Sequence, residues 1–118
     1  MFFGPIVSDC IFCKIVAGEI PSQPVYDDEM VLAFKDLHPV APTHVLIIPK
    51  KHVKDLAGAA GDGEAVLGWF ETAAAKIAAD AGITDFRVVS NNGRGAGQSV
   101  LHLHYHLLAG PRMAWPPG

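Results

Sequence analysis

Three histidines alternate with large apolar residues near the carboxyl end of the chain, in the stretch HLHYHLL at residues 102–108. In a β-strand, residues two positions apart share a face and lie about 6.6 Å from one another. On a helix the same spacing would scatter them around the axis. The alternation therefore predicts a strand with three imidazoles on one face and Leu103, Tyr105 and Leu107 on the face toward the core.

Three imidazoles on one face of a strand suit at least two chemistries. Neutral imidazoles spaced as His-x-His are good ligands for zinc or copper. Alternatively, one neutral imidazole nitrogen attacks phosphorus while its neighbours donate hydrogen bonds to the oxygens. An incidental cluster is the third interpretation, and the strict alternation with large apolar residues disfavours it.

A glycine-rich loop, NNGRGAGQS at residues 91–99, leads directly into this strand. Glycines allow backbone N–H groups to approach an anion closely, and Ser99 adds a hydroxyl donor. The loop is expected to join two strands, so it does not match a dinucleotide-binding fingerprint, which opens a helix. An ordinary hairpin loop is the alternative, but beside three histidines we interpret the loop as a phosphate cradle.

The other patterns along the chain predict an α+β fold with an antiparallel sheet. Strands are expected at residues 25–26, 30–35, 44–48, 86–89 and 100–108. A short helix is expected at residues 12–17, and a long helix between Asp62, its expected N-cap, and Gly82. The Gly/Ala-rich residues 56–63 are expected to form the loop that leads into the long helix.

The composition limits the class of protein. At 118 residues, half of them apolar and 18% charged, the chain has the size and hydrophobicity of one folded domain. Two cysteines cannot staple a disulfide framework, and a net charge of −3 without a Lys/Arg stripe disfavours a nucleic-acid polymer as partner. We find neither a membrane-spanning apolar run nor a basic, hydrophobic leader, and therefore expect a cytoplasmic protein without a membrane partner.

The histidine strand resembles the histidine-triad (HIT) family, whose motif is His-φ-His-φ-His-φ-φ with φ apolar, if Tyr105 counts as apolar. Further segments resemble the nucleotide-binding branch of that family, the Hint proteins. These segments are CIFCKI at 10–15, APTH at 41–44, IPKKH at 48–52, GQSV at 97–100 and WPPG at 115–118. The resemblance implies a single HIT domain over residues 1–118, of which residues 1–8 are expected to be flexible.

This resemblance implies a HIT-like α+β fold with a five-stranded antiparallel sheet per subunit, one long and one short helix, and a homodimer. Residues 110–118 would form a C-terminal tail that completes the partner's site. The implied activity is hydrolysis of the P–N bond of purine nucleoside 5′-phosphoramidates, and of aminoacyl adenylates, through a covalent nucleotidyl-histidine. AMP or GMP would be released, and no cofactor would be required for catalysis.

The resemblance also assigns roles by position. His104 is the implied nucleophile, His106 binds the phosphate or the leaving group, and His102 orders the triad. His44 is the implied support of the nucleophile, and Ser99 contacts the leaving amine. The implied nucleotide contacts are Asn91, Gly97, Gln98 and Ser99 at the phosphate, Asp36 at the ribose, Leu37, Phe12, Ile15, Ile20 and Phe34 at the base, and Trp115 from the partner's tail. From the residues alone, Asp36 is better explained as a turn residue and Trp115 as part of a loose tail.

Cys10 and Cys13 form a lone C-x-x-C. A redox dithiol belongs in a thioredoxin-like βαβ pattern, which the chain lacks. Packing of the short helix is a second explanation, and half of a zinc site is a third. Some HIT proteins combine this motif with a histidine after the Pro-Lys segment and the first triad histidine, which implies a structural zinc on Cys10, Cys13, His52 and His102.

Three other functions fit the same residues. The first is a dinucleoside polyphosphate hydrolase from another branch of the HIT family. The WPPG ending argues against it, because that ending is typical of Hint proteins. The second is a metalloenzyme with zinc on the three triad histidines, which leaves the glycine-rich loop without a role. The third is a non-catalytic nucleotide-binding regulatory dimer, and the intact triad counts against it.

Overall fold

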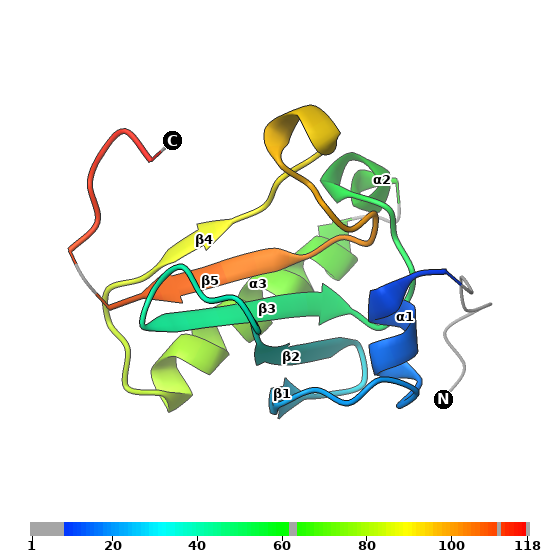
Figure 1. The fold of residues 1–118 in the computed structure, drawn as a ribbon, viewed down its shortest axis with the longest axis horizontal. Helices are drawn as coiled ribbons and strands as arrows, with labels where there is room; N and C mark the ends of the chain where they lie inside the picture. Colours follow the sequence, from blue (N-terminus) through cyan, green and yellow to red (C-terminus); the bar gives the residue numbers. More distant parts are fainter. Residues whose placement is uncertain (1–8, 62–63, 111, 118) are drawn as a thin grey trace.

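Five antiparallel strands form one sheet in the order β1-β2-β3-β5-β4 (Figure 1). In this computed structural model, residues 9–61, 64–110 and 112–117 are described. The strands are β1 (Pro24–Asp27), β2 (Val31–Lys35), β3 (Thr43–Pro49), β4 (Arg87–Val89) and β5 (Tyr105–Ala109). The predicted α+β class with a five-stranded antiparallel sheet is confirmed. The predictions of flexibility for residues 1–8 and of an N-cap at Asp62 lie outside the described residues.

The turn between β1 and β2 is closed by the carboxylate of Asp28. Its Oδ1 accepts hydrogen bonds from the backbone N–H groups of Met30 and Val31, both at 2.8 Å. Its Oδ2 accepts from Tyr26 Oη at 2.6 Å and from Trp69 Nε1 at 3.2 Å. Asp28 therefore ties the turn to the long helix as well as to its own hairpin.

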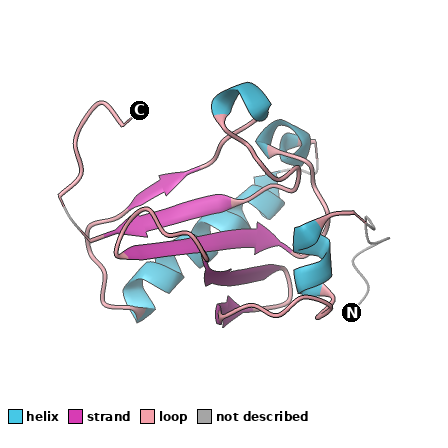
Figure 2. Cartoon of the chain, viewed as in Figure 1, coloured by secondary structure: helices cyan, strands magenta, loops and turns pink. Residues whose placement is uncertain are grey.

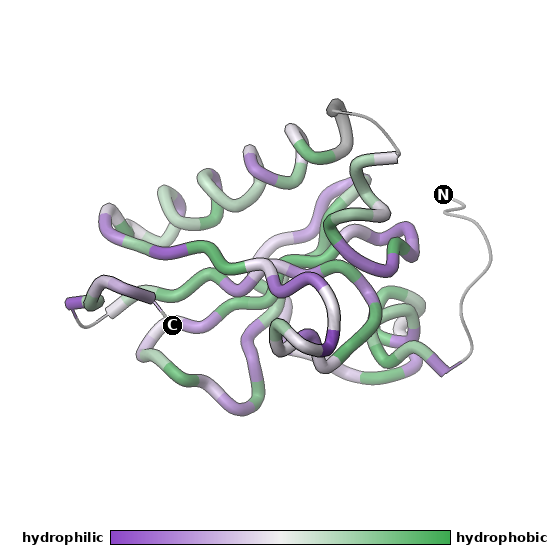
Figure 3. The backbone as a smooth tube through the Cα atoms, turned by 90° about the horizontal axis from the view of Figure 1, so that it is seen from above, coloured by the Kyte–Doolittle hydropathy of each residue, from purple (hydrophilic) through white to green (hydrophobic). Residues whose placement is uncertain are grey.

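The long helix α3 (Glu64–Asp80) lies along one face of the sheet (Figures 2 and 3). Its apolar side buries Phe70 and Ile77 against strand residues such as Ile47 and Leu107, which are fully buried. Removing each such side chain from water contributes roughly 1.5–3 kcal/mol to stability. None of the helices in the described part of the chain is long and apolar enough to cross a membrane.

The opposite face of the sheet is covered at one end by the short helix α1 (Ile11–Val16) (Figure 1). The Sγ atom of Cys10 caps this helix by accepting a hydrogen bond from the Cys13 N–H at 3.4 Å. Phe12 packs with its edge toward Phe34 of β2, with ring centroids 5.8 Å apart. A second apolar cluster, separate from the one under α3, therefore joins α1 to the sheet.

The predicted separation of the two faces at residues 102–108 is confirmed, but the strand is shorter than expected. Leu103, Tyr105 and Leu107 belong to the core cluster under α3. Regular pairing begins only at Tyr105, not at residue 100. The partner strand β3 ends at Pro49, which has no N–H to continue the ladder. The Leu103 N–H bonds instead to the carbonyl of Val53 at 2.6 Å.

The expectation of a loop at residues 56–63 is wrong in its first half, where a further short helix, α2 (Leu56–Ala60), forms. Asp55 is its N-cap, and its side chain accepts a hydrogen bond from the Gly58 N–H at 2.8 Å. An aspartate immediately before a Leu-Ala run is an N-terminal helix signal, and the three glycines of residues 56–63 concealed it. The described residues thus contain two short α-helices and a long one, rather than one of each, and a 3-10 helix, η1 (Arg94–Ala96), in the glycine-rich loop.

Candidate active site

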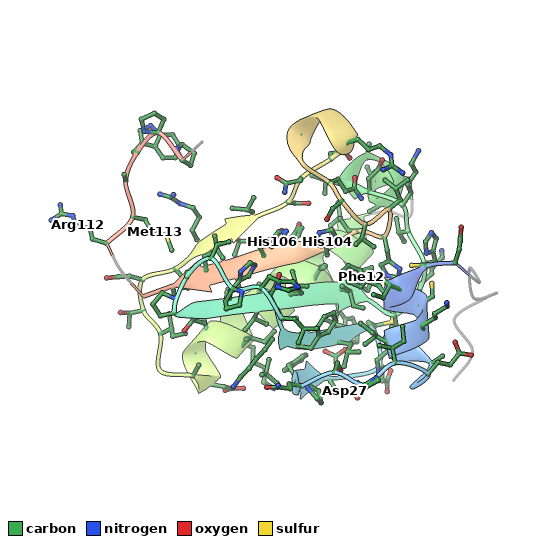
Figure 4. All side chains as sticks on the ribbon, in the orientation of Figure 1. Phe12, Asp27, His104, His106, Arg112 and Met113 are labelled. Atoms are coloured by element: carbon green, nitrogen blue, oxygen red, sulfur yellow. The ribbon has the colours of Figure 1, made fainter. Side chains whose placement is uncertain are left out.

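The candidate active site lies on the face of the sheet opposite α3, where β3 and β5 run side by side. Figure 4 shows His104 and His106 next to each other on this face, with Phe12 of α1 toward one side. The ring centroids of the two histidines are 5.0 Å apart. His44 of β3 packs on His106 from the other strand, with centroids 5.1 Å apart.

His104 is buried, and its hydrogen bond determines which ring nitrogen carries the proton. Nδ1 lies 2.8 Å from the backbone carbonyl oxygen of His102. A carbonyl oxygen only accepts, so the Nδ1–H of His104 donates to it. The lone pair of the neutral ring is then on Nε2. The edge of Phe12 packs against this ring at a centroid distance of 5.2 Å and limits its rotation.

His106 has the complementary arrangement. The Val40 N–H donates to Nδ1 of His44 at 3.1 Å, so the proton of neutral His44 is on Nε2. That N–H donates to Nδ1 of His106 at 2.8 Å. His106 therefore carries its own proton on Nε2. Burial, together with the neighbouring His104 and His44, lowers the pKa of His106 to about 4, so the ring is neutral near pH 7.

His104 and His106 thus have opposite capacities. His104 has an Nε2 lone pair that can attack an electrophile, and His106 has an Nε2–H that can donate a hydrogen bond. Two neighbouring imidazoles whose hydrogen bonds favour opposite tautomers are what covalent catalysis at phosphorus needs. The sequence implied that His44 supports the nucleophile, and the structure places it against His106 instead of His104.

A second cluster lies beside α1, where the predicted metal ligands Cys10, Cys13, His52 and His102 come together. Nδ1 of His102 is 3.3 Å from Cys10 Sγ, 3.7 Å from Cys13 Sγ and 3.2 Å from His52 Nδ1. Cys13 Sγ is 3.2 Å from His52 Nδ1. In a tetrahedral zinc site the ligand atoms are about 3.3–3.8 Å from one another, given the usual Zn–N and Zn–S bond lengths.

The donor chemistry of this cluster also fits zinc. Nε2 of His102 lies 2.8 Å from the carbonyl oxygen of Pro49, so Nε2–H donates there and Nδ1 keeps its lone pair for a metal. Burial lowers the pKa of His102 to about 4 and also lowers the pKa of His52. Both rings are therefore neutral near pH 7, as metal ligands must be. Two thiols and two imidazoles make a set typical of structural zinc.

Asp36, His44 and His106 also bring three potential ligand atoms within 4.8 Å of one another. The hydrogen bonds argue against a metal there. The Val40 N–H occupies the Nδ1 lone pair of His44, so its Nε2 carries a proton and has no lone pair to offer. The 3.3 Å approach of this nitrogen to Asp36 Oδ2 is therefore a polar contact between an N–H and a carboxylate.

The glycine-rich loop is held in shape by the buried side chain of Gln98. Its Oε1 accepts from the Gly93 N–H at 2.8 Å, and its Nε2 donates to the carbonyls of Lys54 at 2.7 Å and Val100 at 3.0 Å. With these bonds made, the Gln98 side chain supports the loop, and its phosphate contact stays a prediction. Gly97 has φ +98°, which favours glycine.

The loop also brings together other predicted phosphate contacts. The Asn91 side chain packs against Gly97, where an added Cβ would lie 3.7 Å from its Nδ2. Ser99 is exposed and lines a cavity of about 490 Å³ together with Lys54 and Arg94. Asp9 lines the same cavity, and with two cations against one carboxylate this side of the loop stays favourable for an anion.

The predicted base contacts are brought together only in part. Phe12 and Phe34 pack in one cluster, with Ile15 against it. Ile20 is half-buried, and no hydrophobic contact links it to that cluster. Leu37 is 79% exposed at the end of β2.

The C-terminal tail holds Trp115 in solvent, with 82% of its surface exposed. The guanidinium of Arg87 fixes the tail by donating to the carbonyl of Ala114 at 2.9 Å. The tail lies at the opposite end of the sheet from α1 (Figure 1). Within this chain Trp115 therefore adds nothing to the base-binding side of the site.

The groups that the sequence missed are backbone atoms. The carbonyls of His102 and Pro49 and the N–H of Val40 fix the tautomers of three histidines. No side-chain pattern identifies such groups. Pro49, which ends β3, gave a partial signal, because a proline has no N–H to continue a ladder.

Comparison with known proteins places the whole arrangement in one family. The family model of the HIT domain matches residues 17–113. The chain belongs to the HIT family. A HIT family hydrolase from Legionella pneumophila superposes with a TM-score of 0.89 at 46% identity, over 93% of this chain and 100% of the other.

Two further relatives bear on the two clusters. A 14 kDa zinc-binding protein of Zea mays is 52% identical over 116 residues, which cover 94% of this HIT chain and 89% of the maize protein. A histidine triad nucleotide-binding protein from Candida albicans superposes with a TM-score of 0.74 at 34% identity, over 90% of this chain and 85% of the other.

Proposed function

We propose that this HIT protein hydrolyses the P–N bond of purine nucleoside 5′-phosphoramidates through a covalent nucleotidyl-His104. We propose that it also hydrolyses related aminoacyl adenylates, in which the bond that breaks is a P–O bond. The observation that carries the proposal is the pair of opposite tautomers: His104 with its lone pair on Nε2, and His106 with its proton on Nε2. A metal-bound triad would need lone pairs on all three rings facing one ion, which the His106 tautomer does not provide.

The proposed reaction has two steps. Nε2 of His104 attacks phosphorus, the P–N bond breaks, and the nitrogen leaves as an amine with a proton from water. His106 donates its Nε2–H to a phosphate oxygen, and the His102 carbonyl stabilises the positive charge that develops on His104 through its Nδ1–H. Water then attacks phosphorus and gives one proton to the hydroxide left by the first step, the P–His bond breaks, and the nucleoside monophosphate leaves with neutral His104 restored. Splitting one displacement into two is the benefit of the covalent intermediate.

The nucleotide site that we propose uses the remaining residues of this face. Asp36 takes the ribose hydroxyls, the glycine-rich loop with Asn91, Gly97 and Ser99 takes the phosphate, and the base packs against Phe12 and its neighbours. The names of two relatives support this proposal, since one is a HIT family hydrolase and the other a histidine triad nucleotide-binding protein. The ending WPPG at residues 115–118 resembles that of the Hint branch and supports placing the chain there.

We also propose a homodimer in which residues 110–118 reach the partner's site. Trp115, Leu37 and Val40 are 82, 79 and 77% exposed, and a second copy packed against them would remove this apolar surface from water. A mass of twice 12.5 kDa by light scattering is the expected result, and a mass of 12.5 kDa would exclude the dimer.

Zinc is the proposed structural metal of the Cys/His cluster, and the similarity to a maize protein named as zinc-binding supports it. Cys10 and Cys13 would supply thiolates, and His52 and His102 neutral imidazoles. The metal would fasten α1 to the segment before β5. Thiolate ligands persist in a reducing compartment, which is consistent with our proposal that the protein is cytoplasmic.

The test of the proposed reaction is AMP release from adenosine 5′-phosphoramidate by the wild type and by His104→Ala. We expect release that falls by about 10³-fold or more in the variant, as for a lost nucleophile. Release that survives the substitution would exclude His104. Faster cleavage of a diadenosine polyphosphate would favour that class of substrate instead, and AMP binding without any turnover would favour a non-catalytic dimer.

A further inference from the structure

Asp36, His44 and His106 lie at neighbouring strands and form a chain of polar contacts beside the nucleophile. Oδ2 of Asp36 is 3.3 Å from Nε2 of His44, and that nitrogen is 2.8 Å from Nδ1 of His106. His44 is only 7% exposed, so water competes little for its N–H. The contacts therefore connect the proposed ribose ligand to the proposed phosphate donor.

The Nε2–H of His44 has two acceptors within reach, Asp36 Oδ2 and His106 Nδ1, and it can make a strong hydrogen bond to only one of them at a time. The Val40 N–H holds Nδ1 of His44, which prevents the ring from donating through its other nitrogen. Any share of the proton that Asp36 takes weakens the bond to His106. This bond is what keeps the proton of His106 on Nε2, the nitrogen that donates to the phosphate in the proposed reaction.

We propose that binding of the ribose hydroxyls to Asp36 sets the donor state of His106. Hydroxyls that donate to Asp36 Oδ2 compensate its charge, so the carboxylate stops competing for the His44 N–H, which then passes to His106. His44 is a positioning residue in this scheme, and the ribose completes the donor that acts on its own phosphate. The inference rests on the proposed nucleotide site and extends it to selection of ribose hydroxyls during catalysis.

A carboxylate that only binds ribose makes a different prediction. Loss of the hydroxyls would then raise KM and leave kcat unchanged, because the contact would be equally strong in the ground and transition states. If the relay operates, a 2′,3′-dideoxy substrate instead loses kcat, by at least about fivefold for one weakened hydrogen bond.

Asp36→Asn separates the two cases. The asparagine keeps Oδ1, which accepts from the His38 N–H at 2.7 Å, and replaces Oδ2 by an NH₂ group that cannot accept from His44. We expect a raised KM in this variant, with the same kcat for adenosine 5′-phosphoramidate and its 2′,3′-dideoxy analogue. His44→Phe should lower kcat equally for both substrates. Asp80→Asn removes the same charge from an exposed position of α3 and should keep the wild-type difference between the substrates.

Two kinetic results would overturn the relay. One is a wild type in which the dideoxy analogue changes KM alone. The other is a ribose-dependent kcat that persists in Asp36→Asn.

Nitrogen-15 NMR of the imidazoles tests the relay without turnover. In the ligand-free protein, Asp36→Asn should shift the His44 Nε2 and His106 Nδ1 resonances toward a stronger mutual hydrogen bond. AMP should cause the same shift in the wild type, and 2′,3′-dideoxy-AMP should not. Unmoved resonances in the ligand-free variant would refute the relay even if the phosphoramidate is cleaved. Shifted resonances without cleavage would refute the proposed reaction and leave the relay standing.

Discussion

Replacement of His106 by asparagine should make the stability of the fold less sensitive to acid. Burial and the neighbouring imidazoles lower the pKa of His106 to about 4, against about 6.5 in an unfolded chain. On acidification the unfolded state therefore takes up this proton first. The free energy of unfolding must fall as the pH drops from about 6.5 to about 4, and this contribution stops changing below that pH.

The magnitude follows from one proton. Uptake by the unfolded state alone changes the free energy of unfolding by about 1.4 kcal/mol per pH unit. Between pH 7.5 and 5.5 the integrated loss is about 1.3 kcal/mol, and partial exposure of the ring reduces the expected loss to about 1 kcal/mol. With an m-value of about 1.5 kcal/mol/M, the urea midpoint of the wild type should fall by about 0.7 M more than that of the variant.

Urea unfolding at both pH values, at one protein concentration, measures this difference. Asparagine is the appropriate replacement because its Oδ1 can accept from His44 in place of Nδ1. His38→Asn is the matched control, since it removes an exposed imidazole that does not belong to the cluster. Equal pH dependence of the wild type and His106→Asn would refute the reasoning, and a wild type that gains stability in acid would reverse its sign.

Three other changes test separate parts of the structure. Asp28→Asn should lower the free energy of unfolding at pH 7 by about 2 kcal/mol, because the carboxylate accepts four hydrogen bonds. Burial alone would raise the pKa of Asp28, but the hydrogen bonds outweigh burial, and the net effect is a lowered pKa. The wild type should therefore exceed the variant in free energy of unfolding by less and less below about pH 4, as measured by chemical unfolding. Gln98→Ala removes the three hydrogen bonds that hold the glycine-rich loop. It should weaken AMP binding by about tenfold, measured by calorimetry, and an unchanged affinity would contradict the role of Gln98 in shaping the loop. Cys13→Ser should reduce the bound zinc from about one equivalent per chain to below about a tenth, measured by mass spectrometry of protein purified without chelators. A wild type that also holds less than about a tenth of an equivalent would refute the metal site.

The sequence predicted the parts of the fold that depend on side-chain periodicity. The alternation at residues 102–108 correctly separated the core face from the histidine face, and Gly82 ends α3 with φ +71° as a left-handed glycine. The start of β5 could not be predicted in the same way. It depends on where β3 stops offering N–H groups, which is a property of the pairing partner at Pro49.

The candidate site shows the same division. The residue types of the Cys/His cluster were available from spacing and resemblance, and the structure brings all four together. The roles of the imidazoles depend on which nitrogen is protonated, and backbone groups at Val40, Pro49 and His102 decide that. Such groups are identical in every residue, so only their position in the fold gives them a function.

His102 belongs to both clusters through different atoms. Its Nδ1 lies among the cysteines, its Nε2–H donates to Pro49, and its carbonyl accepts the Nδ1–H of His104. Phe12, between the two cysteines in the chain, packs its edge on His102 at 5.8 Å and on His104 at 5.2 Å. A metal held by this cluster would therefore restrain both the acceptor that sets the tautomer of His104, the proposed nucleophile, and the ring that limits its rotation. None of the four cluster residues takes the phosphate in the proposed reaction, so a structural zinc and a reaction that uses no metal are compatible in one site.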